Sequence, residues 1–216
     1  MKPIEVDDIE YTPGLLARVY KPTGNGVSPA VVEVHGGGWT QFDRTQNAVA
    51  AEYLAANGIV VASLDFRMPP KVRYPEPIAD INAGIRWLKS HAKMFGSRAA
   101  LVGGLGFSSG GHQLLVAALR PGDERFTKLP CPDAEGVDAN LAYLVACWPV
   151  ADPLARFRMI QERKNENLLR AHAAYFADEA AMEEGNPQRI VESGRAGKLP
   201  PLLIMQGTAD DNLPAD

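Results

Sequence analysis

The stretch Gly106-Phe107-Ser108-Ser109-Gly110 decides the fold that we expect for this chain of 216 residues. It fits the pattern G-x-S-x-G, a sharp strand-to-helix turn that presents a serine hydroxyl. A short apolar segment precedes it and the helix-like run Gln113–Leu119 follows, as this turn requires. The glycines leave room for a strained backbone that passes close to its neighbours. Ser108 is therefore the predicted nucleophile.

A second glycine-rich stretch, His35-Gly36-Gly37-Gly38-Trp39, directly follows the apolar run Ala30–Val34. Such a loop leaves backbone N–H groups uncovered, where they can stabilise the oxyanion of an acyl-transfer intermediate. Gly37, Gly38 and Ser109, the residue after the nucleophile, are the predicted oxyanion donors. A merely flexible turn is the alternative, and the order and context of the two motifs disfavour it.

Length and composition indicate a single domain over residues 1–216 that can bury a substantial core. The net charge of −4 gives no basic surface for nucleic acid. No apolar run approaches the length of a membrane span, and the N-terminal residues have no apolar core of the kind found in secretory signals. Cys131 and Cys147 are too few for a disulfide framework. We therefore expect a cytoplasmic enzyme with neither a membrane nor a nucleic-acid partner.

Strand and helix signals alternate along the chain, which predicts a mainly parallel central sheet with helices on both faces. Residues Ile9–Tyr20 are expected to form a hairpin, and a helix is expected from Asp43 or Thr45 to about Ala56. Ligands of such sheets bind at the carboxyl ends of the strands, where both glycine motifs lie. The polar, helical stretch over about residues 152–187 predicts a small insertion near the active-site edge.

A serine nucleophile needs a base within hydrogen-bond reach, and the base needs an orienting carboxylate. The last predicted strand is Leu202–Met205, and Asp210 follows it at the same edge of the sheet. We therefore take Asp210 as the acid. Asp211 and, more distantly, Asp152 are the alternatives, and turn chemistry alone would account for any of the three.

The base is the partner that the sequence does not supply. Enzymes with this nucleophile turn carry serine, acid and histidine in that order, yet all four histidines precede Asp210. We expect His35 to brace the oxyanion loop and His112 to pack within the helix after Ser108. The other two, His91 and His172, are expected near a helix end and in the insertion.

We therefore expect that the sequence stops short of the catalytic histidine, with one helix and one strand missing. The strand Leu202–Met205 would then be an open, apolar sheet edge. We expect the fragment to aggregate, to form a homo-oligomer, or to pair with another chain that covers this edge.

Three further stretches, Asp65-Phe66-Arg67, Arg86-Trp87-Leu88 and Gln206–Asp210, complete a pattern that resembles the α/β-hydrolase esterases. It is similar to the acetyl-esterase, feruloyl-esterase-like and kynurenine-formamidase-like group, which is related to the hormone-sensitive-lipase family. The resemblance covers about residues 10–216, although the family more often has His where Gln206 stands, and the N-terminal helical cap of the lipase branch is missing. The site residues that it implies are Ser108 as nucleophile, Asp210 as acid, and Gly37 and Gly38 at the oxyanion hole.

The expected function is that of a serine carboxylesterase, which cleaves small acyl esters through an acyl-enzyme without a metal or cofactor. Trp39 and Phe107 are candidates for lining the acyl pocket, and plain core packing is the alternative for both. The alternative functions are those of an amidase or formamidase with the same triad, and of a non-catalytic binding protein that lacks the base.

Overall fold

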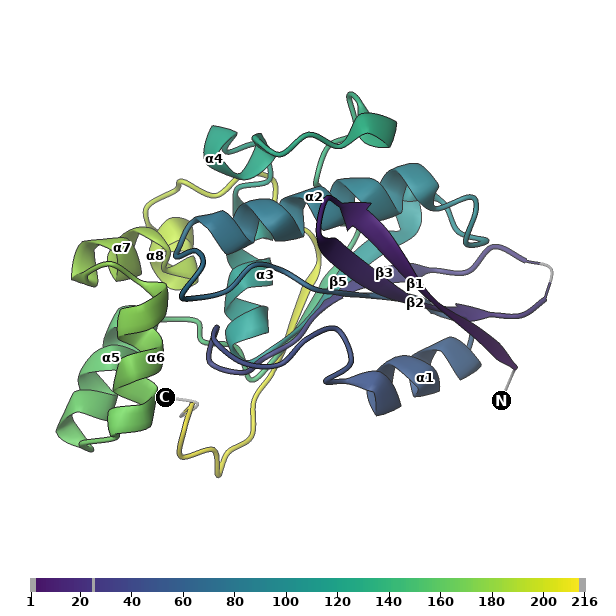
Figure 1. The fold of residues 1–216 in the computed structure, drawn as a ribbon. Coiled ribbons are helices and arrows are strands. Elements are labelled where there is room, and N and C mark those ends of the chain that lie inside the picture. Colours follow the sequence, from purple (N-terminus) through teal and green to yellow (C-terminus); the bar gives the residue numbers. More distant parts are fainter. Residues whose placement is uncertain (1–2, 25, 214–216) are drawn as a thin grey trace.

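A computed structural model describes residues 3–24 and 26–213 (Figure 1). Its centre is a seven-stranded sheet with the order β1-β2-β4-β3-β5-β6-β7. The edge strand β1 pairs antiparallel with β2, and β2 pairs antiparallel with β4, whereas all the other pairs are parallel. The strands are β1 (Ile4–Thr12), β2 (Leu15–Pro22), β3 (Ala30–Val34), β4 (Val60–Leu64), β5 (Val102–Phe107), β6 (Leu144–Cys147) and β7 (Leu202–Met205).

Helices cover both faces of the sheet. One face is covered by α1, and α2 and α3 cover the other (Figure 1). Four short helices connect β6 to β7 and gather at one end of the molecule (Figure 1). The helices are α1 (Ala48–Ala56), α2 (Glu76–His91), α3 (Ser109–Leu119), α4 (Glu124–Thr127), α5 (Pro153–Glu162), α6 (Glu166–Tyr175), α7 (Glu179–Glu184) and α8 (Pro187–Glu192).

Strand alternation divides the core between the two faces. Successive side chains of a strand point to opposite sides, so Val32 joins the cluster under α2 and α3. Its neighbour Val31 joins the smaller cluster under α1, together with Ala51 and Ala55 of that helix. A third cluster lies apart from the sheet and is centred on Trp39 and the helices that follow β6.

The N-terminal hairpin and the first helix have other end residues in the structure than the sequence predicts. The predicted hairpin is longer than expected and spans β1 and β2. The first helix begins at Ala48 and not at Asp43 or Thr45, because Asp43 Oδ1 accepts a hydrogen bond from Thr45 N at 2.8 Å. This bond closes a turn ahead of the helix.

The strand β7 forms the edge of the sheet opposite β1. Its four residues, Leu202 to Met205, are 45–53% exposed although all are apolar. Strands of parallel sheets are normally buried on both faces, so this edge is unusually open for its composition. Among the residues that the structure describes, no helix combines the length and the apolar character that crossing a membrane would take.

Candidate active site

Ser108 occupies the turn between β5 and α3 in a conformation that L-residues rarely adopt, with φ 52° and ψ −120°. Its N–H donates to Cys147 O at 2.9 Å, and its carbonyl accepts from His112 N at 3.1 Å. These bonds hold the strained residue from the strand side and from the helix side. Ser108 is only partly buried, so its hydroxyl is not sealed inside the protein.

The glycines of the motif are required by close approaches of the backbone. A Cβ atom on Gly110 would overlap the carbonyl oxygens of Val34 and His35, which end β3 and start the glycine-rich loop. A Cβ atom on Gly106 would lie 2.7 Å from Gly111 Cα. The turn is therefore tight because three backbone segments meet there.

The glycine-rich loop lies directly against this turn. A Cβ atom on Gly36 would stand 3.3 Å from Ser108 Cβ. Gly37 and Gly38 have φ values of 99° and 59°, which glycine adopts without strain. Ser109 is the first residue of α3, so its N–H has no partner within the helix. The three predicted oxyanion donors thus belong to two segments that meet at Ser108, and their role stays a prediction.

Trp39 fastens the loop to α3. Its backbone N–H donates to Ser109 Oγ at 3.1 Å, and its indole Nε1 donates to His112 Nδ1 at 3.1 Å. The indole is fully buried and stacks on Tyr175, with ring centroids 5.1 Å apart. This environment favours the packing alternative for Trp39 over a place on an open pocket wall.

His112 has both ring nitrogens engaged. Its Nε2–H donates to Gly185 O at 2.8 Å while Nδ1 accepts from Trp39, which fixes the tautomer. Burial, opposed by the hydrogen bond to Gly185 O and assisted by the charge of Arg156, lowers the pKa of His112 to about 4. A neutral ring held between two partners has a structural role, as the sequence predicts.

The other histidines are also engaged away from the nucleophile. His35 Nδ1–H donates to Gly36 O at 2.9 Å, and its ring stacks on Phe66, so it braces the loop as predicted. His172 Nε2 accepts from Arg156, and His91 Nδ1 contacts Trp87 O. No histidine of the described chain is hydrogen-bonded to Ser108 Oγ.

The predicted acid lies in the loop after β7. Asp210 Oδ1 accepts from the N–H groups of Asn212 and Leu213, both at 2.9 Å, and Oδ2 accepts from Gln206 Nε2 at 3.2 Å. The strand register brings this loop to the same edge as Ser108, because Phe107 is level with Cys147 and Cys147 with Met205.

The alternative acids have other partners. Asp152 caps α5 by accepting from Ala155 N at 2.8 Å, which is the turn chemistry expected of an N-cap. Asp211 is exposed, and its backbone carbonyl accepts from Arg163 Nη1. Asp210 therefore stays the predicted acid.

Two hollows flank the glycine-rich loop. One, of about 560 Å³, lies between Gly37, Gly38 and the polar residues Asn167 and Arg170 of α6. The other, of about 580 Å³, has an aromatic lining that includes Phe42 and Phe66 and also contains Arg44 and Lys71. Phe42 adjoins the loop, since a Cβ atom on Gly37 would stand 2.7 Å from its ring.

Phe107 is partly exposed and lies 5.7 Å, between ring centroids, from Trp148, a 41% exposed residue with φ 39°. Trp148 follows β6, and its N–H donates to Met205 O at 2.6 Å. Sequence reasoning missed Trp148, although a tryptophan directly after a strand at the active-site edge was a usable signal. The binding role predicted for Phe107 stays a prediction.

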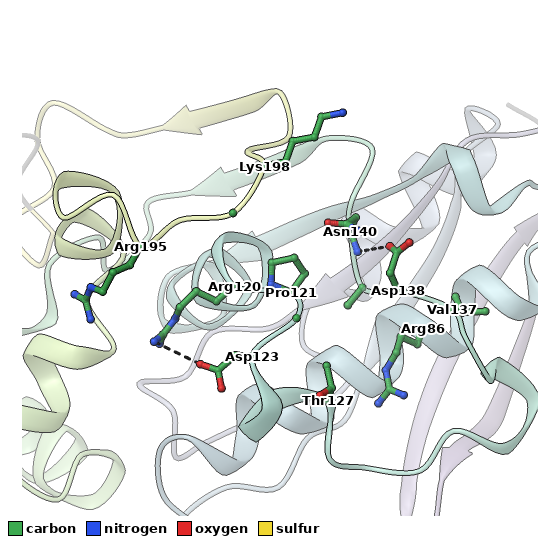
Figure 2. A pocket seen from close by; sticks show the side chains of 13 residues that line it. Arg86, Arg120, Pro121, Asp123, Thr127, Val137, Asp138, Asn140, Arg195 and Lys198 are labelled. Carbon is green, nitrogen blue, oxygen red and sulfur yellow. Dashed lines mark hydrogen bonds and ion pairs between the residues drawn. The ribbon is translucent and has the colours of Figure 1, made fainter.

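A further hollow, of about 690 Å³, lies at the other end of α3, beside Arg120 and Pro121. Its cations Arg86, Arg195 and Lys198 point in different directions and do not converge on one point (Figure 2). It is therefore not built like an anion site. Within residues 3–24 and 26–213, no group of three or more His, Cys, Asp and Glu residues is arranged to hold a metal ion.

A family profile described as BD-FAE matches residues 18–216. The chain belongs to this family. The fold of this BD-FAE chain is that of the α/β-hydrolase esterases, which confirms the fold predicted from the two glycine motifs. Esterase B from Lactobacillus rhamnosis superposes with a TM-score of 0.77 at 24% identity, over 98% of this chain and 69% of that one.

Curated relatives also align over most of the BD-FAE chain. Esterase LipC of Mycobacterium tuberculosis is 28% identical over 88% of the chain and 46% of its own length. The probable carboxylic ester hydrolase LipM of the same organism is 25% identical over 88% of the chain and 43% of its own length. The chain thus spans about half the length of the curated relatives that it matches.

Proposed function

We propose that the protein is a serine carboxylesterase that hydrolyses small acyl esters through an acyl-enzyme. The observation that carries the proposal is the contact of the strained Ser108 turn with the glycine-rich loop, at 3.3 Å between Ser108 Cβ and a Cβ position on Gly36. The names of the relatives LipC and LipM, an esterase and a probable carboxylic ester hydrolase, support the same reaction.

In this reaction Ser108 Oγ attacks the ester carbonyl carbon and passes its proton to a base. The N–H groups of Gly37, Gly38 and Ser109 stabilise the oxyanion, and each such donor typically lowers the barrier by about 3–4 kcal/mol. The ester C–O bond then breaks, and the alcohol leaves with the proton. Water attacks the acyl-enzyme in the same way, releases the acid and restores the serine.

Asp210 would orient and stabilise the protonated base in this scheme. None of the four described histidines is placed to be that base, so the proposal requires a base that these four do not supply. This requirement makes a test on the full-length gene product essential.

The test is covalent labelling of the full-length gene product by a fluorophosphonate probe, together with turnover of p-nitrophenyl acetate and of an N-formyl arylamine. We expect labelling and ester turnover, and we expect Ser108→Ala to lose both. The matched control is Ser193→Ala, at a serine that lies in the turn after α8. Labelling that survives in Ser108→Ala, or turnover of the formamide alone, would contradict the proposal.

We also infer that the protein acts in the cytoplasm on a small-molecule ester. Cys131 and Cys147 are both free and buried. Unpaired cysteines are typical of the reducing cytosol, where disulfides are rare. Alkylation of denatured protein taken directly from cells would find both thiols free if this inference holds.

A further inference from the structure

A buried arginine connects the helical segment after β6 to the loop that carries Asp210. Arg156 lies on α5 and is 7% exposed. Its Nε donates to Asn212 O at 3.3 Å, and its Nη2 donates to Asn212 Oδ1 at 2.6 Å. Its Nη1 donates to His172 Nε2, on α6, at 2.9 Å. One guanidinium thus joins two segments of the chain, at His172 and at Asn212, which lie 40 residues apart.

Asn212 is also hydrogen-bonded to the predicted acid, Asp210. Its N–H and that of Leu213 both donate to Asp210 Oδ1. Leu213 is buried in the third cluster, beside Trp39. The position of the Asp210 carboxylate is therefore set by a loop whose far end is held by Arg156 and by the burial of Leu213.

The same guanidinium lies next to the other half of the site. The Arg156 Cζ atom stands 5.9 Å from the centre of the Trp39 ring, within the range of a cation–π contact. Trp39 in turn holds the glycine-rich loop against Ser109. Arg156 thus contacts both the segment that carries the acid and the residue that fixes the oxyanion loop.

Packing alone does not explain a charged group in this place. Within the described residues Arg156 forms no ion pair, so a buried cation is surrounded by neutral acceptors. Burying a charge without a counterion is costly, and an apolar side chain of similar size would avoid that cost. An apolar residue could not supply the three directed hydrogen bonds. Burial outweighs the opposing effect of the Asp210 charge and lowers the pKa of Arg156 to about 10.

We propose that Arg156 is a positioning residue for ester hydrolysis, which fixes the Asp210 loop relative to Trp39 and the oxyanion loop. The proposal rests on the proposed function. Arg156 does not line either hollow beside the glycine-rich loop. Its loss should therefore disturb the geometry of the acid and leave substrate binding nearly unchanged.

The experiment compares Arg156→Met and Arg156→Lys in the full-length gene product. The control is Arg158→Met, at an exposed arginine two residues along the same helix that pairs with Glu179. Hydrogen–deuterium exchange of a peptide covering 206–213 measures the attachment of the loop, and a peptide covering 104–112 serves as internal reference. Turnover of p-nitrophenyl acetate gives kcat and KM separately.

For Arg156→Met we expect the amides of 206–213 to exchange about 10–100-fold faster, as the loss of charge-assisted hydrogen bonds implies. We expect kcat to fall by about 10²-fold, the scale of an ångström-sized misplacement, with KM nearly constant. Arg156→Lys keeps the charge and should restore part of both effects. Arg158→Met should behave as the wild type.

Asn212→Ala provides a second variant, because this residue is exposed and its substitution should leave folding intact. It should reproduce part of the loss in kcat, and combining it with Arg156→Lys should add less than the two separate effects. Unchanged exchange at 206–213 in Arg156→Met, or faster exchange with an unchanged kcat, would overturn the inference. A wild-type protein that hydrolyses no ester would instead overturn the proposed function, and the exchange data would still decide whether Arg156 holds the loop.

Discussion

At the scale of single residues, the site depends on one strained backbone and on the glycines that permit it. A residue in a sparsely populated region of φ and ψ costs on the order of 1–3 kcal/mol, and Ser108 is such a residue. The structure keeps it there because β5, α3 and the glycine-rich loop meet without intervening side chains. The strain is thus maintained by the surrounding backbone.

Gly110→Ala is expected to destabilise the protein, because the added methyl group would overlap the carbonyl oxygens of Val34 and His35. Overpacking of this kind typically costs about 1–3 kcal/mol, and here the neighbours are backbone atoms that cannot rotate away. The free energy of unfolding in urea measures the effect. Gly122→Ala is the control, since a Cβ atom there meets nothing within 4 Å. Equal stabilities of the two variants would show that the turn is looser than described.

At the scale of elements, α3 is the part that joins the pieces of the site. Its first turn holds Ser109 and His112, which bind Trp39, and Gln113 Oε1 accepts from Tyr175 OH of α6 at 3.2 Å. Arg120, which directly follows the end of α3, reaches a second junction, where α7 is attached through Glu184.

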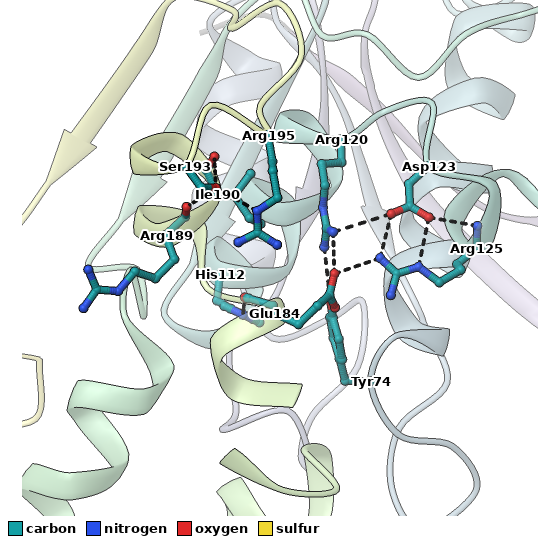
Figure 3. Close-up of polar contacts among 11 residues, drawn as sticks. Tyr74, His112, Arg120, Asp123, Arg125, Glu184, Arg189, Ile190, Ser193 and Arg195 are labelled. Atoms are coloured by element: carbon teal, nitrogen blue, oxygen red, sulfur yellow. Dashed lines mark hydrogen bonds and ion pairs between the residues drawn. The ribbon is translucent and has the colours of Figure 1, made fainter. Parts of the chain in front are cut away.

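Figure 3 shows the side chains that converge on Glu184 at this junction. The carboxylate accepts from Tyr74 Oη, Arg120 Nη1 and Arg125 Nη2. Burial alone would raise the pKa of Glu184, but these hydrogen bonds lower it to about 2. The next residue, Gly185, accepts from His112. The end of α7 is therefore attached to α3 at two neighbouring points.

The junction of α3, Trp39 and α6 should make the protein sensitive to acid. Burial lowers the pKa of His112 to about 4 and that of His172 to about 3, below the usual value of 6.5. The unfolded chain therefore binds protons first, and stability present above pH 6.5 is lost as the pH falls toward 4. For His112 the loss is on the order of 3 kcal/mol.

Urea midpoints between pH 7.5 and 4 measure this loss. His112→Asn keeps an acceptor for the indole of Trp39. In this variant the urea midpoint should fall less between pH 6.5 and 4 than in the wild type. His91→Asn, at a histidine outside the junction, should leave the profile as in the wild type. If the urea midpoints of the wild type and of His112→Asn fell equally with pH, the His112 ring would not be the cause of the acid sensitivity.

At the scale of the whole molecule, the open strand β7 is the main departure from a closed α/β structure. Four half-exposed apolar residues stand at a sheet edge where no further strand pairs within residues 3–24 and 26–213, and another strand can add there. The opposite edge is formed by β1, whose exposed residues are mostly charged or polar. We therefore expect any self-association to involve β7 and not β1.

The 216-residue chain is expected to self-associate at micromolar concentration, and Leu203→Lys should shift it toward the monomer, because a charge at an edge strand opposes pairing. Light scattering after size-exclusion chromatography gives the molar mass. Val49→Lys is the control, at an apolar residue that is 84% exposed on α1. A wild-type chain that stays monomeric at all concentrations would contradict this expectation.

The sequence predicted the parts of the site that depend on local backbone geometry. The turn at Ser108, the glycine-rich loop and the strand before Asp210 were found because glycine patterns and apolar runs report directly on nearby backbone. The fold followed from them and is confirmed by the comparisons. The chemical roles of these residues stay predictions.

The contacts that hold these parts together could not be predicted. Trp39 meets His112 across 73 positions of the chain, and Arg156 meets Asn212 across 56. Neither residue has a local pattern that distinguishes a connecting side chain from one that packs or faces solvent. Trp39 in particular was a candidate pocket residue, whereas its indole lies inside the third cluster.

The hydrogen bonds of His112 have a consequence for grafting. Trp39 and the Gly185 carbonyl meet on one imidazole, so the segment between β6 and β7 is not an interchangeable module. A chimera that receives this segment from a homologue must also bring a carbonyl group in the same place, or the indole loses its orientation. Point changes at Asn167 or Arg170, which face the hollow beside α6, leave this arrangement untouched.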